Sequence, residues 1–484
     1  MSLLYRSSGA IPAVDEKLCA DLLLEETFSA IFPDDTRRRI FLAVLTNPLT
    51  DSADITRRAA ILRDFTAAPN LLEALRTELT ALAKLHDTAQ AERSHAYSVT
   101  KKHVSTATAR VLVMIGADTV RKALAGVVGI HTVLSMYQAA SDGLSAVKAR
   151  AGTFAALAED ADFTALCEAL SRYGYAGETM PEIRIAVTED GRVGACELSA
   201  LHPIAAQETQ KSSVLKKLFA AKAAVLPDPS VFCEDRFDHM KGTLLMQALT
   251  RTFELLDTLT RQIFDEFLPL NRELAFYEAA SAYVHAFREK RIPLTTPTIA
   301  AENRITALYD PLLCTQRMTA AGIVSHDVSL ASGAGVILTG ENNSGKTVYL
   351  RSVGCAQLLF QAGLPIPAEA AEMRIFAAVR TGYAAAEKEF TAGNEAGRFE
   401  QEVREMAALV DSIRPDTLLL LNEIFQSTAY AEGAAGLYAI LRYLAGKGTG
   451  FLLVTHLREL LPMMWNTVLH LQTGSGYTVQ PADE

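Results

Sequence analysis

A glycine-rich segment between two apolar stretches constrains the fold of this chain more than any other feature. The segment GENNSGKT (340–347) has the spacing GxxxxGK[ST]; it follows the apolar run GVILT (335–339) and precedes a helix-like stretch. In such a strand–loop–helix unit, backbone N–H groups and the helix N-terminus hold phosphate groups, because both carry partial positive charge. We therefore predict an α/β domain with a phosphate-binding loop, in which Lys346 reaches the β- and γ-phosphates and Thr347 holds Mg²⁺.

Two further apolar runs end in polar residues that suit the same chemistry. TLLLL (417–421) is followed by Asn422 and Glu423, and FLLV (451–454) is followed by a Thr-His pair that contains His456. The carboxyl ends of parallel strands lie on the ligand side of a sheet. Glu423 is then a candidate to polarise the attacking water, and His456 a candidate to sense the γ-phosphate. Alternatively, Glu423 only caps a strand and His456 is a satisfied structural residue.

The loop and the two strand ends define the expected ATP site. Its expected catalytic residues are Lys346, Glu423 and His456. Its expected metal-side residues are Thr347, Asn422 and Glu423. The expected nucleotide contacts along the loop are Gly340, Asn342, Asn343, Ser344, Gly345, Lys346, Thr347 and Val348. Asn422 is neutral, so it can hold a water near Mg²⁺ but supplies no charge.

A second glycine-containing turn precedes a helix-like stretch, in the segment 393–413. Gly397 and Arg398 stand at the expected helix start, which makes this turn a second candidate anion site. The segment lies between the glycine loop and the acidic strand. That order is found in ATPases in which the helix N-terminus of one subunit closes over the ATP of its partner, and Arg398 would add a positive charge there. A simple loop with a helix cap is the alternative.

The chain is expected to have two domains, a mainly helical one over 1–295 and an α/β one over 296–484. In PNLLEALRTELTALAKLH (69–86), leucines recur with the period of an amphipathic helix. A longer helical pattern covers 243–290, where Pro269 should kink or divide the helix. It indicates a lever-like or coiled element, or else an ordinary bundle helix. The segment 181–198 alternates apolar and polar residues around a glycine turn, which predicts a β-hairpin.

Charge and cysteine content exclude several classes of protein. Lys and Arg number 46 against 56 Asp and Glu, and the first 295 residues and the remainder are each net acidic. A generally basic nucleic-acid binder is thereby excluded, and any DNA contact must use a local patch. Such a patch is offered by Lys211, Lys216, Lys217 and Lys222, although a solvated helix face explains them equally well.

The cellular location expected from these features is the cytoplasm, with no membrane attachment. The six cysteines contain no CxxC pair, which is typical of a reduced compartment. The first residues show no signal peptide. The most apolar stretch, 123–139, is shorter than a membrane span and contains His131, so it is expected to be a buried helix.

The order of the α/β motifs is that of ABC-type ATPases, and their residues resemble the MutS family of DNA mismatch-repair ATPases. The matching segments are LTGENNSGKTVYLR (338–351), GLPIPA (363–368), GRFEQE (397–402), NEIFQSTAYAEG (422–433) and VTHLREL (454–460). A weaker resemblance extends upstream to 42–65, to the long helical pattern in 244–300, and to IVSHDVSL (323–330).

The resemblance implies a multidomain α plus α/β protein: a helical core and lever domain followed by an ABC-type P-loop ATPase domain with a mainly parallel sheet. It implies a homodimer through the ATPase domains, binding of ATP and Mg²⁺, and coupling of nucleotide state to double-stranded DNA in mismatch repair or related DNA maintenance. The family's mismatch-reading domain is expected to be absent. Ile323 stands where the family has an aromatic adenine contact, and Asn422 where it has Asp, so slow hydrolysis is expected.

Other functions fit the same residues. The chain is either an active ATPase or a nucleotide-switched DNA-binding module that hydrolyses ATP poorly because of Asn422. An ATPase that acts on a protein partner and not on DNA is the second alternative, which the acidic balance of both parts favours. A metabolic kinase is a distant third, because no motif for a substrate pocket is found.

Overall fold

The chain forms two compact units. The first contains residues 1–72, 139–145 and 272–484, and the second contains residues 73–138 and 146–271. In the computed structural model, the residues described are 2–5, 11–99, 106–137, 141–172, 179–187, 193–203, 234–317, 319–331, 333–384, 398–425, 428–464 and 467–482. The division into functional domains at residue 295 stays a prediction.

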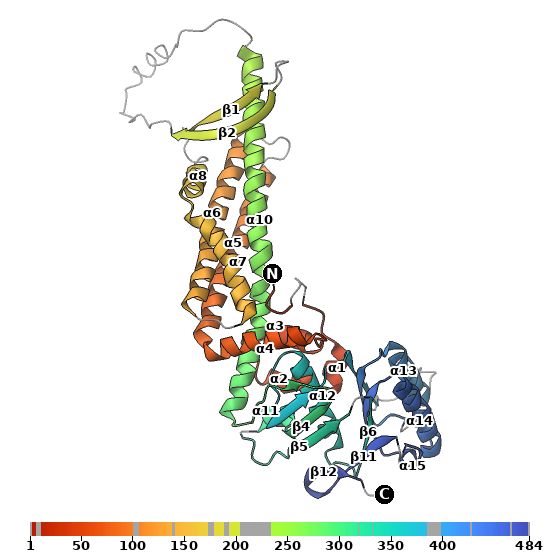
Figure 1. The fold of residues 1–484 in the computed structure, drawn as a ribbon. Helices are drawn as coiled ribbons and strands as arrows, with labels where there is room; N and C mark the ends of the chain where they lie inside the picture. Colours follow the sequence, from red (N-terminus) through yellow and green to blue (C-terminus); the bar gives the residue numbers. More distant parts are fainter. Residues whose placement is uncertain are drawn as a thin grey trace. The chain divides into compact units, whose positions relative to one another are not determined.

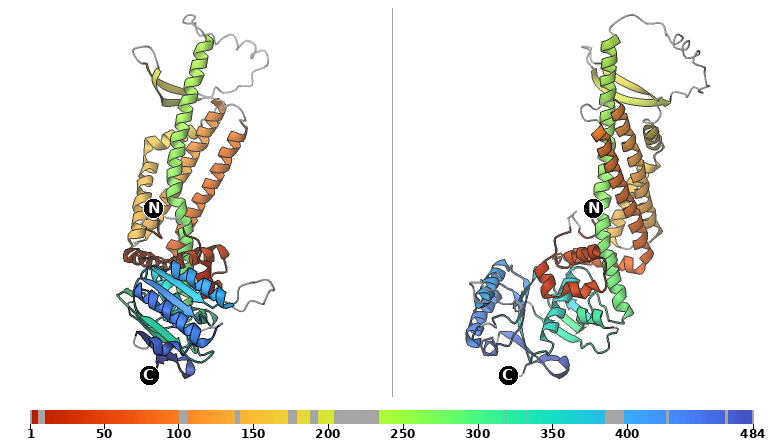
Figure 2. Two further views of the ribbon diagram at one scale, coloured as in Figure 1. Left: turned by 90° about the vertical axis from the view of Figure 1, so that its right-hand side faces the viewer. Right: turned by 180° about the vertical axis from the view of Figure 1, so that it is seen from behind.

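The second unit is mainly helical (Figures 1 and 2). Its elements, some of which begin or end in the first unit, are α5 (Pro69–Val99), α6 (Thr106–Met136), α7 (Asp142–Glu159), α8 (Ala161–Arg172), β1 (Thr179–Val187), β2 (Val193–Pro203) and α10 (Glu234–Glu289). The aromatic rings of His86 and Phe264 pack α5 against α10, and those of Phe154 and Phe267 pack α7 against α10. The leucines on one face of the 69–86 pattern are buried, as their helical spacing predicts; these are Leu71, Leu72, Leu75, Leu79 and Leu82.

Helix α10 continues through Pro269, so the proline does not divide the helix, and the alternative, a kink, stays a prediction. A proline inside a helix removes one backbone hydrogen bond. Tertiary packing of the residues beside it offsets that loss, since Phe267 and Leu270 are almost fully buried. The predicted hairpin is confirmed, because β1 and β2 pair antiparallel. The lysine cluster Lys211–Lys222 lies outside the described residues.

No helix among the described residues is long and apolar enough to cross a membrane. The stretch from residue 123 belongs to α6, where Ala123, Val127 and Leu134 are buried, as expected of a core helix. The four cysteines with described side chains, Cys19, Cys167, Cys314 and Cys355, form no disulfide.

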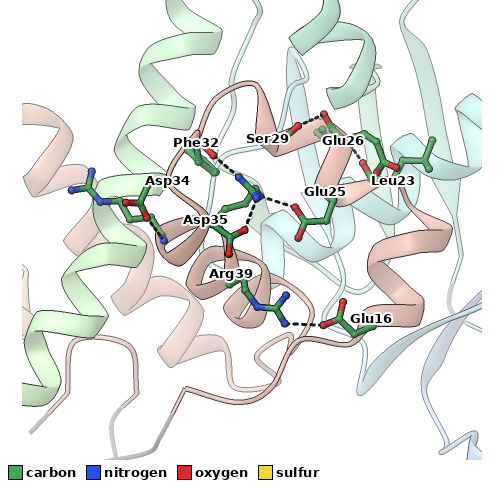
Figure 3. Close-up of polar contacts among 12 residues, drawn as sticks. Glu16, Leu23, Glu25, Glu26, Ser29, Phe32, Asp34, Asp35 and Arg39 are labelled. Atoms are coloured by element: carbon green, nitrogen blue, oxygen red, sulfur yellow. Dashed lines mark hydrogen bonds and ion pairs between the residues drawn. The ribbon is translucent and has the colours of Figure 1, made fainter.

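The first unit begins with four helices, α1 (Glu16–Asp21), α2 (Leu24–Ser29), α3 (Asp35–Leu45) and α4 (Ser52–Ala67). Three of these helices have an aspartate as their N-cap residue. Asp34, for example, accepts a hydrogen bond from the backbone N–H of Arg37. Figure 3 shows the polar contacts between α1, α2 and α3. There the guanidinium of Arg38 donates to Glu25, to Asp35 and to the carbonyl oxygen of Phe32.

Two sheets follow in the same unit. The larger has the strand order β12 (Val479–Pro481), β11 (Val468–Thr473), β6 (Gly335–Thr339), β10 (Gly450–Val454), β9 (Thr417–Asn422) and β8 (Ala378–Tyr383). All neighbouring strands are parallel except β12, which is antiparallel to β11. The smaller, which the sequence did not predict, has the order β3 (Thr298–Ile299), β7 (Ala370–Met373), β4 (Asn303–Leu308) and β5 (His326–Leu330).

Helices cover both faces of the larger sheet, which explains its continuous apolar strands. Leu419 and Leu421 of β9 pack into a cluster with α13 (Arg398–Ser412), α14 (Tyr430–Gly446) and α15 (Leu460–Met464). Leu420, between them, points to the other face and lies against Gly354 of α12 (Lys346–Gln361). The predicted helical plus α/β architecture is therefore present.

Helix α12 is buried from Tyr349 to Gln361. Its two buried glutamines are fully engaged: Gln357 accepts from Asn303 and donates to Gln361, whose amide also donates to the carbonyl oxygens of Leu49 and Phe376. Gly363, two residues beyond the end of the helix, has a φ of 76°. A Cβ built there would lie 2.9 Å from Cβ of Arg58 and 3.0 Å from the carbonyl oxygen of Ile55.

We expect Gly363→Ala to lower the free energy of unfolding of the first unit by about 2–4 kcal/mol, because a left-handed backbone and overpacking against α4 both oppose a methyl group. Gly448→Ala is the matched control, since Gly448 also has a positive φ but open space around it. The control should cost only about 1–2 kcal/mol. Hydrogen exchange of the α12 amides measures both losses, and equal losses would contradict the packing argument.

Candidate functional site

The glycine loop joins β6 to α12 through three residues with positive φ. These are Gly340 at 150°, Asn343 at 60° and Gly345 at 93°. A Cβ on Gly340 would collide with Oγ1 of Thr473, so only glycine fits that position. The side chain of Ser344 donates to the carbonyl oxygen of Glu341 over 2.7 Å, which tightens the loop. The turn therefore ends at the N-terminus of a 16-residue helix, where anions are stabilised.

The side chain of Lys346 folds back over the glycine loop. Its ammonium donates to the carbonyl oxygens of Gly340, at 3.0 Å, and Glu341, at 2.6 Å. The side chain is almost fully buried, and this desolvation lowers the pKa of the ammonium, while the negative charge of Glu423 acts in the opposite direction. A weakly hydrated positive charge at the mouth of the loop is suited to bind phosphate oxygens.

The end of β9 meets the start of α12. The hydroxyl of Thr347 donates to the side-chain oxygen of Asn422 over 3.3 Å. The next residue, Glu423, has a φ of 57°, an unusual conformation for a residue with a side chain, and its backbone N–H donates to Val454 of β10. One oxygen of its carboxylate lies 3.0 Å from Nε2 of His456. The strand ends therefore bring together the polar residues that the sequence singled out.

A cavity of about 750 Å³ opens beside the loop. It is lined by Leu313, Arg317, Gly322, Ile323, Val324, His326, Asn342, Asn343, Ser344, Gly345, Lys346, Thr347, Val348, Glu423 and Tyr477. Its size is that of a pocket for a small organic ligand. The residues of the glycine loop line one part, and the aliphatic side chains Leu313, Ile323 and Val324 line another.

The predicted site residues are mostly found here. Asn342 to Val348, Ile323 and Glu423 line the cavity. Gly340 contributes a carbonyl oxygen to Lys346, and Asn422 and His456 contact Thr347 and Glu423. Gly397 lies outside the described residues, and of Arg398 only the backbone, at the start of α13, is described. The structure adds Leu313, Arg317, Val324, His326 and Tyr477, which the sequence did not single out.

The oxygen donors near Thr347 fit a magnesium ion shared with phosphates. Among the described residues, no group of three or more His, Cys, Asp or Glu side chains is placed to bind a metal by itself. Thr347 and Asn422 supply a hydroxyl and an amide oxygen side by side. Mg²⁺ typically takes only one or two protein ligands and completes its octahedron with water and substrate phosphates, so this donor set suits it.

One wall of the cavity is built by α11 (Pro311–Gln316), which carries Leu313. Its N-cap Asp310 accepts from the backbone N–H of Leu313 and receives two hydrogen bonds of 2.9 Å from Arg351 of α12. Both charged side chains are buried. Lys290 donates to the carbonyl oxygens of Cys314 and Thr315 at the other end of α11. The helix that forms the wall is thus fixed at both ends.

Comparison with known proteins agrees with this geometry. The family model for MutS domain V matches residues 336–473. The DNA mismatch repair protein MutS of Synechococcus sp. is 35% identical over 147 residues, which are 30% of this chain and 16% of that protein. DNA mismatch repair protein MSH2 of Saccharomyces cerevisiae is 28% identical over 200 residues, 40% of this chain and 20% of that protein.

Endonuclease MutS2 of Enterococcus faecalis is 28% identical over 229 residues, 46% of this chain and 28% of that protein. Residues 336–473 therefore match MutS domain V, and the chain is similar to proteins of the MutS family. The family resemblance seen in the motifs is thereby confirmed. The chain spans less than a third of the length of each of these MutS relatives. The MutS domain V match contains the glycine loop and the ends of β9 and β10.

We expect Arg351→Leu to destabilise the first unit of this MutS-like chain by about 3–5 kcal/mol, because it leaves the carboxylate of Asp310 buried without its cation. Arg304→Leu is the control: its ion pair with Glu302 is exposed, and its loss should cost less than about 1 kcal/mol. Hydrogen exchange of the α12 amides reports both values. A loss for Arg351→Leu as small as the control's would refute the role of the buried pair.

Proposed function

We propose that this chain binds ATP with Mg²⁺ in the cavity beside the glycine loop and hydrolyses it. One observation carries the proposal: Glu423, from the end of β9, lines the same cavity as Lys346 and Thr347. A carboxylate beside a phosphate-binding loop has no use in phosphate binding itself, because it repels the ligand. It is explained by a role toward water, as a general base.

In the proposed mechanism, the backbone N–H groups of the loop and the ammonium of Lys346 hold the β- and γ-phosphates. Thr347 and Asn422 would hold Mg²⁺, which supplies positive charge to the phosphate oxygens when bound. The carboxylate of Glu423 orients a water molecule toward the γ-phosphorus and accepts its proton. His456 lies against that carboxylate, so it positions Glu423 and responds to the charge of the γ-phosphate.

Hydrolysis is proposed to be slow. An aspartate at position 422 would place a negative charge beside Mg²⁺, whereas the neutral amide of Asn422 supplies only a dipole. The family resemblance also supports an ABC-type arrangement in which two ATPase domains form a homodimer. In it, Gly397 and Arg398 of one subunit would close over the ATP of the other, with Arg398 as a positive charge at the γ-phosphate.

We further propose that nucleotide state controls binding to double-stranded DNA, in mismatch repair or related DNA maintenance in the cytoplasm. The MutS and MSH2 relatives support this, since both are DNA mismatch repair proteins. Contacts to the phosphate backbone should dominate, and affinity should then fall steeply with salt. An ATPase that acts on a protein partner is the second candidate, favoured by the net charge of −10.

Asn422→Asp tests the proposed mechanism. We expect it to raise the ATP turnover number by about tenfold or more, because a charged ligand strengthens the metal's hold on the phosphates. Steady-state phosphate release measures the rate. The double substitution Asn422→Asp with Glu423→Gln is the control and should return turnover to background, since a general base contributes roughly 10²–10⁴-fold. An unchanged rate in Asn422→Asp would rule out Asn422 as the limit on turnover.

The DNA proposal is tested by fluorescence anisotropy with labelled matched, mismatched and branched duplexes. We expect binding that differs between no nucleotide, ADP and ATP with Mg²⁺, and that weakens linearly in a plot of log affinity against log salt. Lys346→Met, which removes the phosphate-binding cation, should abolish the difference between nucleotides. If no duplex binds in any state while ATP is still hydrolysed, the protein-partner function replaces this one.

A further inference from the structure

Residues 2–5 are held by side chains of the first unit, largely through their backbone. The backbone N–H of Leu3 and the hydroxyl of Ser2 donate to the two carboxylate oxygens of Glu273 on α10, each over 2.5 Å. The hydroxyl of Tyr277, one turn further along α10, donates to the carbonyl oxygen of Leu3 over 2.8 Å. Ser2 and Leu3 are buried, although they belong to no helix or strand. We call residues 2–5 the clasp.

Two consecutive arginines of α4 complete the grip on the clasp. The guanidinium of Arg57 donates to the carbonyl oxygens of Ser2, at 2.6 Å, and Leu3, at 3.2 Å. Arg58 donates to the carbonyl oxygen of Leu4 over 2.9 Å. Hydrogen bonds from a charged donor are stronger than those between neutral groups. The backbone of the clasp is therefore bound by side chains in the way that a peptide ligand would be.

Arg58 connects the clasp to the helix that follows the glycine loop. Its guanidinium also donates to the carbonyl oxygen of Ala362, the C-cap residue of α12, over 3.3 Å. A cation is stabilised at a helix C-terminus, where the carbonyl oxygens carry partial negative charge, and an anion is stabilised at the N-terminus. Helix α12 therefore has the cation of Arg58 at one end and the expected phosphate site at the other.

The clasp contains buried charges, which make its closed state costly. Arg58 is 1% exposed, and its Nε has no hydrogen-bond partner among the described residues. Burial lowers the pKa of this guanidinium and raises the pKa of the Glu273 carboxyl. Burial of Leu3 and Leu4 offsets the cost of removing these charges from water. A segment whose closed state is such a balance, outside the helices and strands, can open while the rest of its unit stays folded.

We propose that nucleotide binding at the glycine loop closes the clasp, and that the closed clasp in turn favours nucleotide binding. The shared contact is Arg58, a positioning residue that has no part in hydrolysis. When the clasp opens, the guanidinium is released toward water, and the carbonyl oxygen of Ala362 loses a buried donor. The end of α12 is then less well fixed, and so is the loop that α12 carries. The coupling acts equally in both directions. The inference rests on the proposed nucleotide binding.

The test measures how fast a thiol at position 2 becomes accessible in the whole chain. Ser2→Cys exchanges one side-chain atom, and its reaction with N-ethylmaleimide is followed by mass spectrometry of the peptide that contains position 2. We expect this position to react faster than Cys19, which is buried in α1 and becomes accessible when the first unit unfolds. ATP with Mg²⁺ should slow the reaction at position 2 about fivefold or more, the usual size of coupling between sites.

Two controls accompany this measurement. Ser29→Cys places a thiol at an exposed position of α2, and its reaction rate should not depend on ATP. Lys346→Met, combined with Ser2→Cys, removes the phosphate-binding cation and should abolish the effect of ATP on position 2. Calorimetry with ATP and Mg²⁺ establishes independently whether nucleotide is bound.

The reciprocal effect is tested without a new thiol. Tyr277→Phe removes one donor to the clasp and keeps the buried ring. It should raise the calorimetric Kd for ATP about two- to fivefold, because one buried hydrogen bond is lost from the closed state. Tyr283→Phe is the matched control and should leave the Kd unchanged, since Tyr283 is also a buried tyrosine of α10 but donates to the carbonyl oxygen of Pro365.

Several results would overturn the inference. With ATP bound, an unchanged rate at position 2, or no reaction there in either state, would mean that the clasp is a fixed part of the fold. One common rate for position 2 and Cys19 would mean that the clasp opens only when the unit unfolds. An unchanged Kd in Tyr277→Phe, or an equal change in Tyr283→Phe, would remove the reciprocal effect. In all these cases the nucleotide site still stands, whereas parent protein that binds no ATP would remove the proposed function and the inference with it.

Discussion

The burial of helix α12 is the constraint on which the rest of the first unit depends. Its N-terminus carries the glycine loop, its middle packs on Leu420 of the larger sheet, and its C-terminal end is enclosed by residues of the N-terminal helices. Arg58 of α4, itself buried, donates to the carbonyl oxygen of Ala362 just beyond the helix. A helix with no solvent-exposed face cannot turn or shift alone, so the loop that it presents has one position relative to β6, β9 and β10.

The site concentrates opposite charges where water has been removed. Lys346 and Glu423 line the same cavity, and the ammonium of Lys346 donates to two carbonyl oxygens of the loop. The negative charge of Glu423 raises the pKa of that ammonium, in opposition to the lowering of this pKa by burial. Asn422, placed between the loop and Glu423 in the chain of contacts, adds no further charge.

Much of this site could be predicted from the sequence, because its main residues lie in short segments with recognisable local patterns. The glycine loop and each apolar strand can be recognised from a segment of about ten residues, and parallel pairing of the strands then brings their carboxyl ends together. The other contributors could not be found this way. Tyr477 reaches the loop from more than a hundred residues away, and the pairing of Arg351 with Asp310 depends on how α11 docks. Pro269 does not divide α10 as its local effect predicts, because burial of its neighbours offsets the lost hydrogen bond.

The contacts of α12 have a consequence for the N-terminal helices. The backbone N–H of Leu49 donates to the carbonyl oxygen of Gln361, and the side-chain amide of Gln361 donates to the carbonyl oxygen of Leu49. Gly363 fits against the turn of α4 that contains Ile55. Any ligand that binds only the folded site stabilises everything that must unfold with it, by an amount that grows with the logarithm of its concentration. A ligand in the cavity would therefore also stabilise residues that are far from it in sequence. With the proposed nucleotide binding, the resistance of these residues to proteolysis is expected to rise with the nucleotide concentration.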